Sequence, residues 1–225
     1  MIMHAMARVE IITDDGVTIV GTYHEGGKDG PAALLLHMMP ATKESWRTLV
    51  EALKARGFST LAIDLRGHGE SVLGQGGKRL DHKLFSDAEH QAKANDVDVA
   101  VRWLEAQGRT RSRMAVVGAS IGANLAISFA AADHQVPATV ALSPGLDYRG
   151  VKTADPASSM PRSQKLLLAA SEDDEYSFHS IRELSKIKTD AEVQELKDAG
   201  HGTTMLEREP SFLQYVVEWI VNNVH

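Results

Sequence analysis

The sequence predicts a three-layer α/β fold, with a mostly parallel, twisted sheet and helices on both faces. Two observations predict it. Short runs that are apolar throughout, such as Ala32–His37, are typical of strands covered on both faces. Between these runs, apolar residues recur three and four positions apart, as on one face of a helix. Because no internal repeat interrupts the alternation, we expect residues 1–225 to form a single domain.

The first two strands are expected to be antiparallel. Val9–Thr13 and Val17–Tyr23 are rich in β-branched residues and flank the turn Asp14-Asp15-Gly16. An Asp-Gly pair between two such runs is a strong signal for a hairpin. The parallel part of the sheet then begins with Ala32–His37.

The later elements follow in alternation. Gly57 stands where a C-terminal cap would end the first helix, and Ser86-Asp87-Ala88-Glu89 has the capping-box pattern that opens a helix. Further strands are expected over Ser59–Leu65, Arg113–Val117, Ala138–Leu142, Lys165–Ala170 and Glu192–Leu196. Helices are expected to carry the apolar sets Trp46, Leu49, Val50 and Leu53; Ala94, Val97, Val101 and Leu104; Ala123–Ala132; Ile181, Leu184 and Ile187; and Phe212, Leu213, Val216, Val217 and Ile220.

The pentapeptide Gly118-Ala119-Ser120-Ile121-Gly122 lies between a predicted strand and a predicted helix. Glycines at this junction remove side chains where strand and helix crowd, and the serine hydroxyl projects from the sheet edge. Gly-x-Ser-x-Gly alone is weak evidence, since a structural turn with an idle serine fits it too. The context favours a nucleophile elbow with Ser120 as the nucleophile.

Composition narrows the chemistry. The formal net charge of -6 argues against a nucleic-acid or anionic-membrane surface, which would need clustered Lys and Arg. The chain has no cysteine, which excludes disulfides and thiolate sites. No stretch approaches the roughly 18 apolar residues of a membrane span, so we expect a cytoplasmic protein with a small-molecule partner. Catalysis must then use Ser, His and carboxylates.

A serine hydroxyl needs a base to take its proton and a group to orient that base. His201 lies between two glycines, after a predicted strand and before a helix, which places it at the carboxyl edge of the sheet. We therefore expect His201 to be the general base. The acid is expected at a strand end between serine and histidine, where Asp173 and Asp174 both occur. No histidine pair has metal-ligand spacing, so neither a metal nor another cofactor is expected.

With these residues the chain resembles the α/β-hydrolase superfamily, from Val9 to the last helix. A second motif, Asp64-Leu65-Arg66-Gly67-His68-Gly69-Glu70-Ser71, is similar to the family's Asp-x-Arg-Gly-x-Gly-x-Ser turn and is more specific than the elbow. Its expected role is structural, because the planar guanidinium of Arg66 can hold neighbouring loops together.

The resemblance also implies an oxyanion hole. His37-Met38-Met39-Pro40 stands where the family commonly has His-Gly-x, so Met38 departs from the pattern. An oxyanion hole uses main-chain N–H groups, which this change leaves in place. Matching the family position implies that the amides of Met39 and Ile121 hold the oxyanion. The alternative is that both methionines only fill the core.

The resemblance favours Asp174 as the acid. Asp174-Glu175-Tyr176-Ser177 resembles the Asp-x-Tyr-Ser endings of small esterases without a lid. Asp173 stays open as an alternative, and Asp147 is a third choice. Ser143–Ser163 is expected to be only a loop, too short for a large lid, as in the dienelactone-hydrolase-like and small carboxylesterase branches.

The resemblance and the residues together predict a serine esterase acting on short-acyl or small-molecule esters. Thioesterase, amidase or perhydrolase chemistry would use the same triad. A hydrolase-fold binding module without turnover is the alternative from another class. A homo-oligomer is compatible with all of these.

Overall fold

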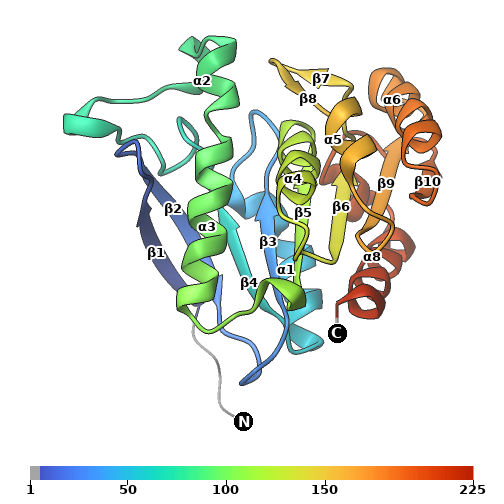
Figure 1. The fold of residues 1–225 in the computed structure, drawn as a ribbon, viewed down its shortest axis with the longest axis horizontal. Coiled ribbons are helices and arrows are strands. Elements are labelled where there is room, and N and C mark those ends of the chain that lie inside the picture. The colour runs from blue at the N-terminus through green and yellow to red at the C-terminus, as the bar shows by residue number, and fades with distance from the viewer. Residues whose placement is uncertain (1–5, 225) are drawn as a thin grey trace.

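The computed structural model describes residues 6–224 (Figure 1). Its main strands are β1 (Met6–Ile12), β2 (Thr18–His24), β3 (Ala32–Leu36), β4 (Ser59–Ile63), β5 (Met114–Ala119), β6 (Ala138–Leu142), β9 (Lys165–Ser171) and β10 (Glu192–Leu196). They form one eight-stranded sheet in the order β1-β2-β4-β3-β5-β6-β9-β10. β1 and β2 pair antiparallel, as expected, and β2 also pairs antiparallel with β4. The pairs from β4 to β10 are all parallel, so the predicted sheet is confirmed.

Helices cover both faces of this sheet. The longer ones are α1 (Arg47–Ala55), α3 (Ala94–Ala106), α4 (Ile121–Ala132), α6 (Glu175–Ile187) and α8 (Pro210–Asn223), and the short ones are α2 (Asp87–Gln91), α5 (Ala154–Ser159) and α7 (Thr204–Arg208). In Figure 1, α3 and α4 lie in front of the sheet, with α1 behind it.

Alternate side chains of the central strand β3 pack into two different hydrophobic cores, one on each face of the sheet. Ala33 and Leu35 pack with residues of α1 and α8, whereas Leu34 and Leu36 pack with residues of α3 and α4. Successive side chains of a strand point to opposite faces, so an all-apolar strand needs a helix layer on each side. This is the physical reason that the apolar run predicts three layers.

The helix that opens at Ser86 is not continuous, contrary to expectation. The capping box of Ser86 and Glu89 is present, but α2 ends at Gln91 and α3 begins at Ala94. At the break, the N–H groups of Lys93 and Asp96 donate to carbonyls three residues back. Such tightened turns replace the regular helical bonds. The break sets the side chain of Lys93 in the interior, where it is fully buried.

The segment expected to be only a loop, Ser143–Ser163, contains structure of its own. A two-stranded hairpin, β7 (Asp147–Tyr148) and β8 (Val151–Lys152), is followed by α5. Arg149 and Gly150 at its tip have φ of 56° and 78°, the left-handed pair that two-residue hairpin turns favour. The expectation of a plain loop was wrong, because an Arg-Gly pair is a weak turn signal. These elements remain small, and within residues 6–224 no large lid covers the sheet edge.

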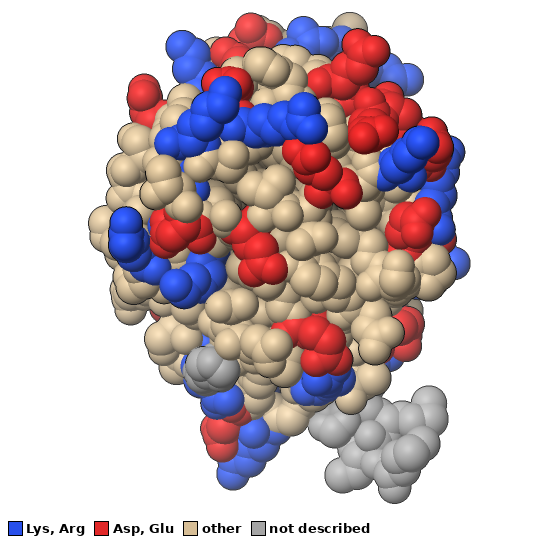
Figure 2. All heavy atoms as spheres, turned by 90° about the vertical axis from the view of Figure 1, so that its right-hand side faces the viewer, with Lys and Arg blue, Asp and Glu red and all other residues tan. Residues whose placement is uncertain are grey.

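Charged side chains of both signs are mixed on one face of the molecule (Figure 2). The right-hand side of the molecule in Figure 1 faces the viewer in Figure 2, where acidic and basic side chains are interspersed on a largely uncharged surface. No helix within residues 6–224 combines the length and apolar character that crossing a membrane requires.

Candidate active site

Ser120 lies at a sharp turn between β5 and α4. Its φ of 55° and ψ of -122° are strained for a residue with a side chain. The flanking glycines explain how the turn is accommodated: a Cβ on Gly118 would lie 2.0 Å from the carbonyl oxygen of Gly122, and a Cβ on Gly122 would lie 2.2 Å from that of Leu36. The sequence thus folds into the tight strand-to-helix turn that Gly-x-Ser-x-Gly predicts.

Asp174 and His201 meet at the same edge of the sheet. Asp174 follows β9 and precedes α6, and His201 lies on the loop between β10 and α7. Nδ1 of His201 donates to Oδ2 of Asp174 at 2.7 Å. Burial opposes ionisation of Asp174, but the hydrogen bond and charge of His201, with contacts to Ser177 and Ser143, hold the pKa of this carboxyl below its usual value. Asp174 can therefore fix the orientation of the imidazole.

The other two candidate acids contact different groups. Oδ1 of Asp173 accepts hydrogen bonds from the N–H of Gly200 and from the hydroxyl of Ser171. Asp147 lies on the β7–β8 hairpin, where its carboxylate accepts from the N–H of Gly150. The structure therefore brings Asp174 to His201, whereas Asp173 supports the backbone of the same loop.

The loop of His201 packs directly against the serine turn. The N–H of Gly202 donates to the hydroxyl of Ser143 at 2.9 Å, and a Cβ on Gly202 would lie 3.3 Å from that of Ala119. Within residues 6–224, no hydrogen bond joins the hydroxyl of Ser120 to His201. Catalytic hydrogen bonds of this kind often tighten only when substrate binds.

Tyr148, which the sequence analysis did not select, joins this network from the β7–β8 hairpin. Its hydroxyl lies 2.9 Å from that of Ser177, which in turn donates to the carbonyl oxygen of Ser143. Burial raises the pKa of the Tyr148 phenol, as does the negative charge of Asp174, while hydrogen bonds with Ser177 and Ser120 oppose the rise. A tyrosine in a segment expected to be a loop carries no sequence signal for this position.

Met39 follows β3 and Ile121 follows the turn of Ser120. In the described part of the chain, the main-chain N–H of neither residue has a hydrogen-bond acceptor. That of Ile121 belongs to the first turn of α4, where N–H groups lack helical partners and carry partial positive charge. Two unpaired donors, one on the loop after β3 and one at the start of α4, are of the kind that binds a developing oxyanion.

His37 holds the loop of Met39 in place. Its Nδ1 lies 2.8 Å from the carbonyl oxygen of Met38, and its Nε2 accepts from the N–H of Leu65 at 2.9 Å. Burial lowers the pKa of His37 to about 4, so the ring is neutral at physiological pH and can donate at one nitrogen while accepting at the other. The first parallel strand is thereby tied to the end of β4.

The octapeptide after β4 also ties loops together. Arg66 donates from its main-chain N–H and from Nε to the buried carboxylate of Asp96, at 2.8 and 2.7 Å, and its terminal nitrogens bind Asp15. Asp64 accepts from the N–H and Nζ of Lys43, both at 2.8 Å. Both contacts agree with a structural role for this motif.

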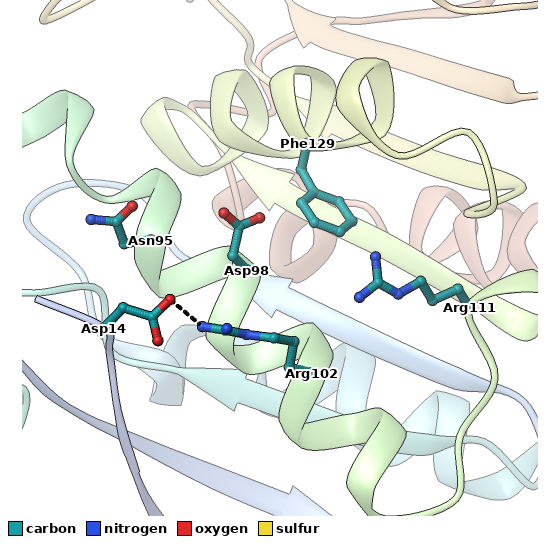
Figure 3. A pocket seen from close by; sticks show the side chains of 6 residues that line it. All are labelled: Asp14, Asn95, Asp98, Arg102, Arg111 and Phe129. Atoms are coloured by element: carbon teal, nitrogen blue, oxygen red, sulfur yellow. Dashed lines mark hydrogen bonds and ion pairs between the residues drawn. The ribbon is translucent and has the colours of Figure 1, made fainter.

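A cavity of about 270 Å³ lies between α3 and α4 and is lined by Asp14, Asn95, Asp98, Arg102, Arg111 and Phe129 (Figure 3). None of the residues selected for catalysis lines it. Its arginines are already paired, Arg102 with Asp14 and Arg111 with Glu105 and Asp133. Among residues 6–224, no group of three or more His, Asp or Glu side chains could hold a metal ion.

Comparison with known proteins agrees with this fold. Residues 32–209 match the family described as serine aminopeptidase, S33, a family of α/β hydrolases. The chain therefore belongs to this family, and its fold is that of an α/β hydrolase.

Individual relatives differ in their named activities. The chain is 31% identical over 142 residues to the polyketide transferase ATR5 of Stachybotrys chlorohalonatus, covering 62% of this chain and 45% of that protein. It is 27% identical over 170 residues to the thiohydrolase aneE of Aspergillus aculeatus, covering 73% and 50%. The chain thus spans about half the length of these relatives. Among solved structures, the Pyrococcus furiosus esterase Pf2001 superposes with a TM-score of 0.81 at 20% identity, covering 99% of this chain and 94% of that one.

Proposed function

We propose that the protein is a serine hydrolase that cleaves carboxylic esters through an acyl-enzyme. In this proposal Ser120 is the nucleophile, His201 the general base and Asp174 the group that orients His201. The observation that carries it is the 2.7 Å contact between Asp174 and His201, on a loop that packs against the strained turn of Ser120. The structural likeness to an esterase supports the same class of substrate.

The reaction follows from these positions. The hydroxyl of Ser120 attacks the ester carbonyl while Nε2 of His201 takes its proton. The N–H groups of Met39 and Ile121 stabilise the negative oxygen of the tetrahedral intermediate. His201 then returns the proton to the leaving alcohol as the carbon–oxygen bond breaks. Water, activated by the same histidine, releases the acid from Ser120.

The substrate is proposed to be an ester with a short acyl chain. The β7–β8 hairpin and α5 stand where larger relatives of this fold insert a lid, but they contain only two strands of two residues each and one short helix. So little cover offers little apolar surface for a long chain. A fluorophosphonate probe tests the catalytic class, because it labels an activated serine. Labelling should be lost in Ser120→Ala, and folded wild-type protein that takes no label would favour a binding module without turnover.

Thioester hydrolysis is the second candidate. The relative named a thiohydrolase, which this chain matches over 73% of its length, favours it. Amide cleavage and perhydrolysis would use the same residues. Comparing kcat/KM for an oxygen ester and a thioester with the same acyl group separates the first two candidates.

A further inference from the structure

Lys93 is buried in an unusual position. At the break between α2 and α3 its side chain is completely covered, yet within residues 6–224 no carboxylate lies within ion-pair distance of it. Asp96, three residues on, is occupied by Arg66. Burying an ammonium group without a carboxylate partner is costly, and such groups are rare outside functional sites.

Lys93 contacts Met39, on the loop proposed to supply the oxyanion hole. Its Nζ lies 2.6 Å from Nδ1 of His90 and 3.8 Å from the sulfur of Met39. The ring of Phe85 lies 5.5 Å from the same atom. Lys93 is thus in direct contact with the side chain of a residue whose N–H is a candidate oxyanion donor.

Lys93 changes charge near neutral pH, and so does Asp96 three residues on, whose pKa burial raises to about 6. Burial lowers the pKa of Lys93 to about 7; the charge of Asp96 opposes this shift, and those of Arg66 and Arg149 add to it. Burial also lowers the pKa values of His37 and His90 to about 4 and that of His68 to about 2, so these three rings are neutral. His82 stacks on His68 with the ring centroids 3.7 Å apart.

We propose that Lys93 is a positioning residue for the oxyanion hole. Its side chain packs against that of Met39 and, when protonated, adds positive potential where the oxyanion develops. This inference rests on the proposed ester hydrolysis. A charge in an interior of low dielectric acts over several ångströms, so Lys93 need not touch the substrate. The side chain of Met39 is its direct contact with the proposed oxyanion loop.

The test compares kcat of wild type and Lys93→Met between pH 6 and 9 with p-nitrophenyl acetate. Methionine removes the charge but keeps an unbranched side chain, and replacing a buried charge by an apolar group is often tolerated. We expect kcat to fall on the order of ten-fold at pH 6 with little change in KM. The ratio of the two kcat values should approach one by pH 9, where wild-type Lys93 is neutral. A structural role alone gives a ratio that does not change with pH, and that result would overturn the inference.

Two further variants complete the experiment. Lys93→Gln keeps a donor without the charge, so it should behave like Lys93→Met; wild-type kcat at pH 6 would overturn the inference. Lys83→Met is the matched control, because Lys83 is exposed on the preceding turn, and its pH profile should equal that of wild type. If wild type neither hydrolyses esters nor takes a fluorophosphonate label, the proposed function fails instead, which is distinguishable from a pH-independent ratio.

Discussion

Asp174 accepts a hydrogen bond from Nδ1 of His201 at 2.7 Å, although 27 positions separate the two residues in the chain. The next-door carboxylate of Asp173 holds the N–H of Gly200, one residue before His201. Two consecutive acids thus bind two consecutive residues of one loop. Of the two, Asp174 is the one that contacts the imidazole ring, so the two acids should differ in their effect on catalysis.

Asp174→Asn should reduce kcat by several orders of magnitude, because the amide leaves the imidazole misoriented. Asp173→Asn should have a much smaller effect, since an amide oxygen can still accept from Gly200. Steady-state hydrolysis of a p-nitrophenyl ester measures both. A severe loss in Asp173→Asn with near-normal Asp174→Asn would reverse the assignment, and near-normal activity in both would direct attention to Asp147.

Ser120→Ala should abolish nearly all turnover while changing the melting temperature little. The hydroxyl serves the chemistry, whereas the backbone strain at this position belongs to the turn and persists with alanine. His201→Ala should match it in activity. Retention of more than about a tenth of wild-type ester hydrolysis in Ser120→Ala, when loss of a triad residue typically costs far more, would contradict the elbow assignment.

Acyl length should affect kcat/KM only up to about six carbons. Each methylene that enters an apolar pocket contributes about 0.8 kcal/mol, so a long acyl tunnel would give a steady rise, and an open site should give a plateau. A series of p-nitrophenyl esters below their micelle limits makes the comparison. A rise that continues beyond about ten carbons would require a covering element, drawn from 143–163, from 73–84 or from a second subunit.

Arg66→Met should destabilise the fold by about 3 to 5 kcal/mol at neutral pH, because it leaves the buried carboxylate of Asp96 without its charged partner. Burial already raises the pKa of Asp96 to about 6, against the opposing charge of Arg66. Without Arg66 this pKa rises further, so the folded variant keeps a proton that the unfolded chain releases.

The loss of stability caused by Arg66→Met is expected to depend on pH. Stability falls with rising pH wherever the folded state binds more protons than the unfolded state. The loss caused by Arg66→Met should therefore be smaller at pH 5 than at pH 8. Urea denaturation at both pH values, with the exposed Arg102→Met as control, measures it. An equal loss at both pH values would show that Asp96 does not depend on Arg66.

Much of the fold could be predicted from the sequence, because apolar periodicity reports directly which faces are buried. The runs that became β3 and β6 and the capping box at Ser86 are local signals of this kind. The choice between Asp173 and Asp174 was not local, because it depends on how the turn after β9 directs each side chain. The break at Lys93 also escaped prediction, because helical residues continue on both sides of it.

The same limit applies to the residues that surround the site. Met39 meets Lys93 only because the loop after β3 packs against the break between α2 and α3. Ser120, by contrast, carries its structural context in the five residues of its own motif. A motif can be predicted from the sequence when its function depends on the local backbone. Contacts between distant loops cannot be predicted in this way.

The β7–β8 hairpin is anchored at few points. Asn124 of α4 donates to the carbonyl oxygen of Val151 and accepts from the N–H of Gly145, and the hydroxyl of Tyr176 binds both the N–H and the carbonyl oxygen of Asp147. All four bonds are to main-chain atoms of the hairpin or its approach. The exposed side chains of Asp147, Arg149 and Lys152 are consequently free to vary without loss of these anchors, whereas Tyr148 contacts Ser177 and Val151 is buried. Lineages of this protein could diversify their substrates by changing these three exposed residues and leave the catalytic loops untouched.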